Sequence, residues 1–230
     1  MIKMKITANL SNNSKWYIFP FLLLLIACPT EDEPPEPSPP DPAEYIEKGW
    51  DDLSSGFYED ALENFNEALS INPENIEATI GKAWCLFFTD SGSSMDMMRY
   101  LFEKGVDDST WAANANCALS IVTFAQGHYT TAIAYADSLL SIAPVYVLDF
   151  YTEIDYHDIL LVKAQAQFLT LEYNEANITM TQINPSLYLD PSQDSWEVNG
   201  TQYFIFESAL SAIIASVTSE YDSGGFISIG

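Results

Sequence analysis

Histidines and cysteines are scarce in this chain, and only one short run groups a histidine with acids. His157 lies between Asp155 and Asp158, whose carboxylates could join it in holding a metal. Zinc sites use three or four protein ligands, mostly His and Cys, so one histidine is too few. We therefore expect no metal here; Asp155 is predicted to cap a helix, with Asp158 in its first turn, where negative charge is favoured. The other histidine, His128, is predicted to lie in a solvated turn.

Catalytic motifs are missing from the sequence. It has no Walker loop, no Gly-x-Ser-x-Gly, no His-Glu-x-x-His and no Cys-x-x-Cys pair. Two histidines leave little for general acid–base catalysis. We therefore expect neither an enzyme nor a cofactor. The exception would be a pair of carboxylates with raised pKa values in one pocket, which scattered acids do not exclude.

Cys28 has the clearest chemical context of the three cysteines. Residues 1–15 carry three lysines and no acid, and residues 16–27 form an apolar run. Twelve apolar residues suit a signal peptide and are too short to cross a bilayer. The run ends in Leu25-Ile26-Ala27-Cys28, which resembles the lipobox of bacterial lipoproteins. The resemblance implies cleavage before Cys28 and acylation of its thiol, with an ordinary secretory signal or a short membrane anchor as the alternative.

A segment rich in proline and acids follows the cysteine. Residues 29–42 contain seven prolines and five acids. Proline favours extended polyproline II, so the segment is predicted to be a semi-rigid tether that reaches about 40 Å. A proline-rich recognition motif is the alternative. The N-terminal part thus divides into a signal peptide (1–27) and a lipidated tether (28–42).

The composition excludes some partners. The 230 residues include 33 Asp+Glu against 8 Lys+Arg, a net charge of −25, and 48% are hydrophobic. Such a chain has apolar material for a core but lacks the basic face that binding to nucleic acid or anionic lipid requires. Membrane attachment is therefore expected through Cys28 alone.

The rest of the chain repeats itself. Residues 56–62 (GFYEDAL) match residues 127–133 (GHYTTAI) at an offset of 71, and residues 69–73 match 140–144 at the same offset. Residues 48–50 (KGW) match 82–84 (KAW) at an offset of 34, and Tyr-x-x-Ala recurs at 173–176. Apolar residues within the first unit recur at helical spacing, at Ala61, Phe65, Ala68 and Leu69.

These features resemble the tetratricopeptide repeat, whose 34-residue unit is a pair of antiparallel helices. The resemblance covers residues 43–185 and is strongest in the first and third units. The second unit needs about three extra residues around Asp90–Ser94, and the fourth has Leu171 where a turn glycine is usual and closes early at Pro185. It implies an all-α fold, a short right-handed superhelix of about four helical hairpins. Residues 186–201 are predicted to be a linker, and 202–222 a C-terminal capping helix stopped by residues 222–225 (DSGG).

In this repeat family, ligands usually lie along the concave surface that the first helix of each unit forms. Counting around those helices predicts an apolar, aromatic strip there. A strip of this kind could be a groove for an amphipathic helix or an extended peptide. Alternatively, it is core, covered by the C-terminal helix. The strip comprises Ile46, Trp50, Ile80, Trp84, Phe87, Phe88, Ile121 and Phe124.

The spacing between the third and fourth units leaves about ten extra residues over 145–155. Tyr146, Phe150 and Tyr151 make this loop a second recognition candidate, with a tolerated insertion as the alternative. Cys85 and Cys117 are predicted to be buried small hydrophobes, although an envelope compartment permits a bond between them.

We therefore predict a lipoprotein anchored in the bacterial cell envelope, in the outer membrane, that binds a protein or peptide partner through the concave surface of its repeats. Neither nucleic acid nor a cofactor is expected, and the oligomeric state is left open. The alternative is a lipoprotein that binds a small ligand or a glycan through the same aromatic residues and the 145–155 loop.

Overall fold

The computed structural model describes residues 41–89 and 95–222. The chain divides into a segment Met1–Ser38 and a folded unit Pro39–Gly230. Three sequence predictions lie outside the described residues: the signal peptide with Cys28 and nearly all of the tether, the insertion at Asp90–Ser94, and the glycines that were expected to stop the last helix.

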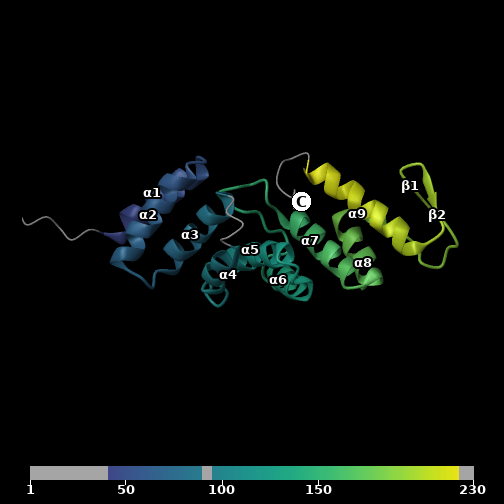
Figure 1. Cartoon of the computed structure of the whole chain (residues 1–230), viewed down its shortest axis with the longest axis horizontal. Helices are drawn as coiled ribbons and strands as arrows, with labels where there is room; N and C mark the ends of the chain where they lie inside the picture. The colour runs from purple at the N-terminus through teal and green to yellow at the C-terminus, as the bar shows by residue number, and fades with distance from the viewer. Residues whose placement is uncertain (1–40, 90–94, 223–230) are drawn as a thin grey trace, which may run out of the picture. The chain divides into compact units, whose positions relative to one another are not determined.

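Four helical hairpins follow one another along the folded unit (Figure 1). Each second helix packs against the first helix of its own hairpin, and those of the first three hairpins also pack against the first helix of the next hairpin. The predicted all-α helical-repeat fold is confirmed, and its right-handed superhelical twist stays a prediction. The hairpins are α1 (Pro42–Ser54) with α2 (Tyr58–Ile71), α3 (Ile76–Phe88) with α4 (Met95–Glu103), α5 (Ala112–Ala125) with α6 (Tyr129–Ile142), and α7 (Tyr156–Leu169) with α8 (Tyr173–Ile183).

The folded repeats begin where the tether ends. Pro42 is the first residue of α1, where its missing N–H costs nothing, and the Asp41 carboxylate accepts a hydrogen bond from the backbone N–H of Ala43 at 3.0 Å. In the second repeat, Asn75 caps α3 by accepting the backbone N–H of Ala78 at 2.8 Å. Short polar side chains thus fix where these helices start.

Three of the hairpin turns share one geometry. Gly56, Gly127 and Leu171 have φ values of +80°, +76° and +66°. In each turn the next residue donates its backbone N–H to a carbonyl five residues earlier, at 2.8 Å in all three cases. The fourth repeat therefore keeps the left-handed turn without the glycine that normally supplies it, and Leu171 carries the strain.

Helices of the first two repeats approach closely over the ring of Phe65. A Cβ added at Gly49 would lie 2.8 Å from this ring, and one added at Gly81 would lie 2.3 Å from it. Phe65 itself is fully buried. The two glycines therefore provide the space into which one aromatic ring of α2 packs between α1 and α3.

The C-terminal part differs from the prediction. Helix α9 (Phe206–Asp222) begins four residues later than expected. The reason is a β-hairpin of β1 (Trp196–Val198) and β2 (Thr201–Tyr203), which occupies part of the predicted linker and the start of the predicted helix. Asn199 and Gly200 both have positive φ, as a two-residue hairpin turn requires. A short 3₁₀ helix, Pro185–Leu187, also lies within the predicted linker.

Two buried clusters hold the folded unit together. The larger runs through the first three repeats and includes Ile159 and Val162 of α7. The second joins Leu161 and Ala164 of α7 to α8, the β-hairpin and α9. In the described ranges, no helix combines the length and the hydrophobicity needed to cross a membrane.

We expect Leu171→Gly to raise the free energy of unfolding by about 1 kcal/mol, because glycine adopts positive φ without the steric cost that leucine carries. Leu171 is 70% exposed, so the substitution removes little packing. Chemical denaturation followed by circular dichroism measures the change.

The reciprocal substitution Gly127→Leu is the matched control and should lower stability by about 1 kcal/mol. Space is available there, since the nearest atom to an added Cβ is the Tyr129 hydroxyl oxygen at 4.0 Å. A destabilised Leu171→Gly variant would contradict the assignment of strain to this turn.

Candidate functional site

The predicted aromatic strip divides into buried and partly exposed residues. Trp84 and Ile80 are fully buried, and Ile46 and Ile121 are 7% and 5% exposed. These four residues therefore pack in the core, which was the alternative to an open groove. The partly buried members of the strip are Trp50, Phe87, Phe88 and Phe124.

Trp84 is the centre of the strip. Its ring makes edge contacts with Phe87 at 5.2 Å and with Phe102 of α4 at 5.1 Å between centroids, and it stacks on Phe88 at 5.8 Å. Its indole N–H donates to the Asn114 side-chain oxygen of α5 at 3.0 Å. One ring therefore joins the second and third repeats, and its single polar atom is satisfied.

The loop between α6 and α7 covers this strip. Phe150 lies 5.0 Å from Trp50 and 5.5 Å from Trp84 between ring centroids, and Tyr151 lies 5.1 Å from Phe88. In Figure 1 the segment after α6 runs back toward α3 before it enters α7. The loop therefore packs on the first helices of the first two repeats, which a mere surface insertion would not do.

Backbone bonds close the loop on itself. The Leu148 N–H donates to the Ile154 carbonyl at 2.9 Å, and the Tyr156 N–H donates to the Tyr146 carbonyl at 2.8 Å. Leu148 and Ile154 are fully buried, and Tyr146 is 8% exposed. Tyr146 thus supports the loop from within the core, and only Phe150 and Tyr151 of the three predicted loop residues retain partial exposure.

The C-terminal helix does not provide the cover. α9 packs against α7, α8 and the β-hairpin. The alternative in which the C-terminal helix covers the strip is therefore wrong, because α9 instead buries the outward face of the last hairpin.

An open depression remains at the edge of the covered strip. It has a volume of about 380 Å³ and is lined by Trp50 of α1, Trp111 and the loop residue Phe150, among others. The Trp50 and Trp111 rings stack in parallel, 5.3 Å apart between centroids at an interplanar angle of 4°. The Trp50 indole N–H donates to a Glu77 carboxylate oxygen at 3.0 Å, which fixes the ring. Three separate parts of the chain thus build one aromatic depression.

Trp111 was missed by the sequence reasoning. It lies just before α5, in a turn where the Asp108 carboxylate accepts the backbone N–H groups of Thr110 and Trp111 at 2.9 and 3.1 Å. A local signal for this turn exists in the sequence, because Asp108 is followed by Thr110 and Trp111 at the spacing of a capping turn before a helix. A count around helical faces cannot reach a residue that precedes the helix.

The Asp155–Asp158 run forms a helix cap, as predicted. Asp155 accepts the His157 backbone N–H at 2.7 Å, and Asp158 accepts the Asp155 backbone N–H at 2.8 Å, which makes a reciprocal capping box at the start of α7. Burial raises the pKa of Asp158 to about 6. Within the part of the chain that the structure describes, no group of three or more His, Cys, Asp or Glu could hold a metal ion.

Cys85 and Cys117 are both buried, as predicted, and they are not bonded to each other. Burial raises the pKa of Cys85 to about 12 and also raises that of Cys117. A thiol with a raised pKa is a poor nucleophile, because the thiolate is the reactive form. These two cysteines are packing residues.

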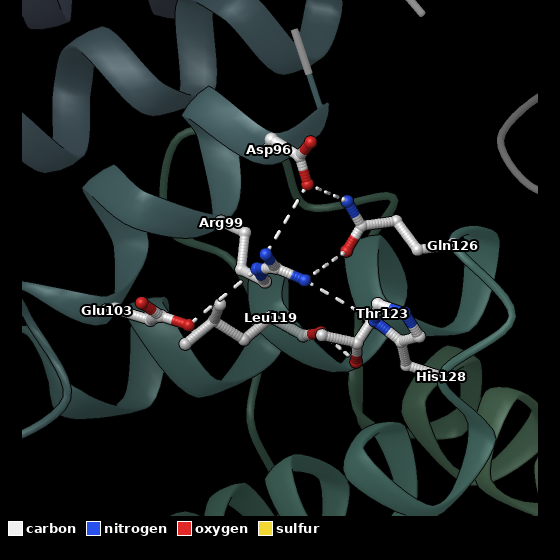
Figure 2. A network of polar contacts seen from close by, with 7 residues as sticks. All are labelled: Asp96, Arg99, Glu103, Leu119, Thr123, Gln126 and His128. Atoms are coloured by element: carbon white, nitrogen blue, oxygen red, sulfur yellow. Dashed lines mark hydrogen bonds and ion pairs between the residues drawn. The ribbon is translucent and has the colours of Figure 1, made fainter.

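A polar network around Arg99 of α4 connects the second and third repeats (Figure 2). Its guanidinium donates to the Gln126 side-chain oxygen at 3.1 Å and lies 3.4 Å from Asp96 and 3.8 Å from Glu103. His128 lies 3.4 Å away and is exposed, as predicted. The two ion pairs lie within α4 and, being partly exposed, contribute little free energy. The contacts of Arg99 with Gln126 and His128 are the ones that join α4 to the end of α5. The network is a structural tie.

Comparisons with known proteins place the fold. No protein-family model and no curated protein sequence matches the chain. Among solved structures, a tetratricopeptide repeat protein from Parabacteroides merdae matches with a TM-score of 0.51 and 14% identity over 79% of this chain and 61% of its own. The fold is that of a tetratricopeptide-repeat protein.

Two structures of the protein MamA give the same result. A MamA structure designated AMB-1 has a TM-score of 0.52 and 13% identity, and covers 79% of this chain and 99% of its own. MamA from Desulfovibrio magneticus RS-1 has a TM-score of 0.50 and 15% identity, and covers 62% and 73%. At sequence identities this low, the similarity between these proteins and this chain is one of fold alone.

We expect Phe150→Ala to lower the free energy of unfolding by about 2 kcal/mol, because it removes a ring that contacts both Trp50 and Trp84. Near-ultraviolet circular dichroism should also change as the tryptophans lose a fixed neighbour. Phe204→Ala is the matched control: Phe204 is 71% exposed, and its loss should change stability by less than about 0.5 kcal/mol. Equal effects of the two substitutions would show that the loop does not pack on the strip.

The raised pKa of Asp158 predicts a pH dependence of stability. Because the folded-state pKa lies above the unfolded one, proton binding favours the folded chain, and this contribution is lost as pH rises through about 6. Protonation of Asp158 between pH 7 and pH 5 should therefore increase the free energy of unfolding by about 1 kcal/mol. Asp158→Asn should abolish this increase. Asp60→Asn, at an exposed position of α2, should leave it in place. Parallel pH profiles of wild type and Asp158→Asn would contradict the assignment.

Proposed function

We propose that this chain is a lipid-anchored module of the bacterial cell envelope that binds a protein partner through the inner face of its helical repeats. The observation that carries the proposal is the open aromatic depression at Trp50, Trp111 and Phe150, which lies on the face formed by the first helices of a tetratricopeptide-repeat fold. Partly exposed tryptophans that are held in place are the residues that most often anchor a binding partner.

The partner site is narrower than the sequence strip. Trp84 and Ile80 are fully buried, and the loop residue Phe150 lies on Trp84. A partner therefore meets Trp50 at the edge of the covered strip, beside Trp111, which the strip did not include. The proposal keeps the concave face and moves the contact to the first and third repeats.

The membrane anchor is supported by the sequence alone. Leu25-Ile26-Ala27-Cys28 follows an apolar run, and a proline-rich tether separates it from α1. The tether leads directly into the Asp41 cap of the first repeat. An acylated Cys28 would therefore hold the repeats away from the bilayer, where a partner can reach them; two acyl signals make such an anchor stable. An outer-membrane location is part of this proposal.

The alternative ligand is a glycan or a small molecule in the same depression. The depression is lined by three carboxylates, Asn114 and Ser54 beside the tryptophans. Polar groups of this kind accept hydrogen bonds from sugar hydroxyls, and aromatic rings can stack on the face of a sugar. Tryptophan fluorescence that stays unchanged with a panel of oligosaccharides would remove this alternative. That the chain is not an enzyme stays a prediction.

The test is crosslinking in the native host, with the tagged full chain followed in membrane and soluble fractions. We expect the wild-type chain in the membrane fraction, crosslinked to a defined polypeptide. Trp111→Leu should abolish the crosslink and remain in the membrane, because leucine keeps an apolar side chain against the core but removes the ring that stacks on Trp50. Cys28→Ala should lose its incorporated lipid and leave the membrane fraction.

Phe204→Ala is the control for an exposed aromatic outside the depression and should retain the crosslink. A crosslink that persists in Trp111→Leu would show that the partner binds elsewhere. A Cys28→Ala chain that stays in the membrane would show that the anchor is a different segment.

A further inference from the structure

The aromatic depression carries acids on three sides. Asp51 belongs to α1, Glu77 to α3 and Asp149 to the covering loop. A second depression of about 530 Å³ adjoins it, sharing Trp50, Asp51 and Glu77 and adding Glu47. The two together form a continuous surface with four carboxylates beside stacked tryptophan rings.

These carboxylates lack a cation from the chain itself. Over residues 41–89 and 95–222, neither lining includes a lysine or an arginine, and none of the four acids takes part in an ion pair. Two other depressions differ: one is lined by Lys82 and Lys104, and another by Lys48. Like charges gathered without a counter-ion repel one another, so a bound cation would be stabilised there.

The aromatic rings favour the same ligand. A tryptophan face attracts ammonium and guanidinium groups, most strongly where water is partly excluded. The Trp50 ring is held by its hydrogen bond to Glu77 and by parallel stacking on Trp111. The rings are therefore in position before a ligand arrives, which lowers the entropy cost of binding. The stacking covers one face of each ring and Phe150 lies against Trp50, so a cation would lie on the face of Trp111 that points away from Trp50.

We propose that the depression at Trp50, Trp111 and Asp149 binds a lysine or arginine side chain of an extended basic segment, with the adjoining depression at Glu47 taking the residues next to it. The inference deepens the proposed function, on which it rests, by giving the partner polypeptide its chemistry. A neutral sugar would fill the depression but leave the four carboxylates without a counter-charge. A basic segment satisfies the rings and the carboxylates together.

The test is calorimetric titration of the full chain, purified in detergent, at low salt. The probe is the capped peptide acetyl-Ala-Lys-Ala-Lys-Ala-amide, and the matched peptide carries acetyl-lysine at both positions. We expect the lysine peptide to bind, with an affinity that falls as salt rises, and the acetyl-lysine peptide to show no binding. Asp51→Asn/Asp149→Asn should weaken binding at least about fivefold, and Trp111→Leu should weaken it as well.

The control for net charge is Glu172→Gln/Glu175→Gln, which removes two exposed acids near the start of α8. It should change the affinity less than about twofold, since exposed charges far from the depression are screened. Equal weakening by the two double variants would overturn the proposal, because binding would then reflect the overall charge. Equal affinity for the acetyl-lysine peptide would also overturn it.

The outcome is distinguishable from that of the crosslinking experiment. If the lysine peptide binds as described but no polypeptide crosslinks in the host, the cation site stands and the proposed function fails. If a polypeptide crosslinks through Trp111 but the lysine peptide does not bind, the cation site is overturned and the proposed function stands. Binding of an oligosaccharide in place of the lysine peptide would identify a glycan site and overturn the proposal.

Discussion

Burial of the Trp84 ring is the interaction on which the first three repeats and their covering loop depend. The ring contacts its own helix, Phe102 of α4 and Phe150 of the loop, and its N–H bonds Asn114 of α5. A single helical hairpin cannot bury such a ring, because it has only one apolar face to offer. The repeats therefore stack, and the loop completes the enclosure from the inner side.

The loop also determines where a partner can bind. In an uncovered repeat array the inner face offers its whole length, whereas here Phe150 and Tyr151 already lie on Trp84, Trp50 and Phe88. What remains is the edge, where Asp149 and Phe150 of the loop line one depression together with Trp50 and Trp111. The loop is therefore both a cover for the core and one wall of the candidate site, which couples the stability of the fold to the shape of the site.

The repeat pattern predicted the hairpins because it depends on short-range spacing. Gly56, Gly127 and the matching Tyr-x-x-Ala positions mark three of the four turns and the helices α2, α6 and α8 that follow them, and the structure places helices there. The same local reasoning identified the Asp155 cap. These features are determined within one or two helical turns, so the sequence alone was enough.

What could not be predicted depends on contacts between distant segments or on a weak local signal. The position of Phe150 over Trp50 joins residues 100 apart, and nothing near either residue indicates it. The predicted start of α9 was wrong because the apolar residues 203–205 continue a helical pattern, whereas Asn199-Gly200 before them is a strong hairpin turn that ends it. At Leu171 the tertiary fold imposes a left-handed residue that sequence preference disfavours.

Helix α7 belongs to both buried clusters, with Ile159 and Val162 on one side and Leu161 and Ala164 on the other. Within the described residues, the two buried clusters are thus connected through α7 alone. The elements α8, the β-hairpin and α9 are stabilised chiefly by contacts with one another and with α7. Partial unfolding can then begin at the C-terminal end while the first repeats stay intact. Such an opening would expose the Leu161 side of α7, an apolar surface of the kind through which partly folded chains aggregate.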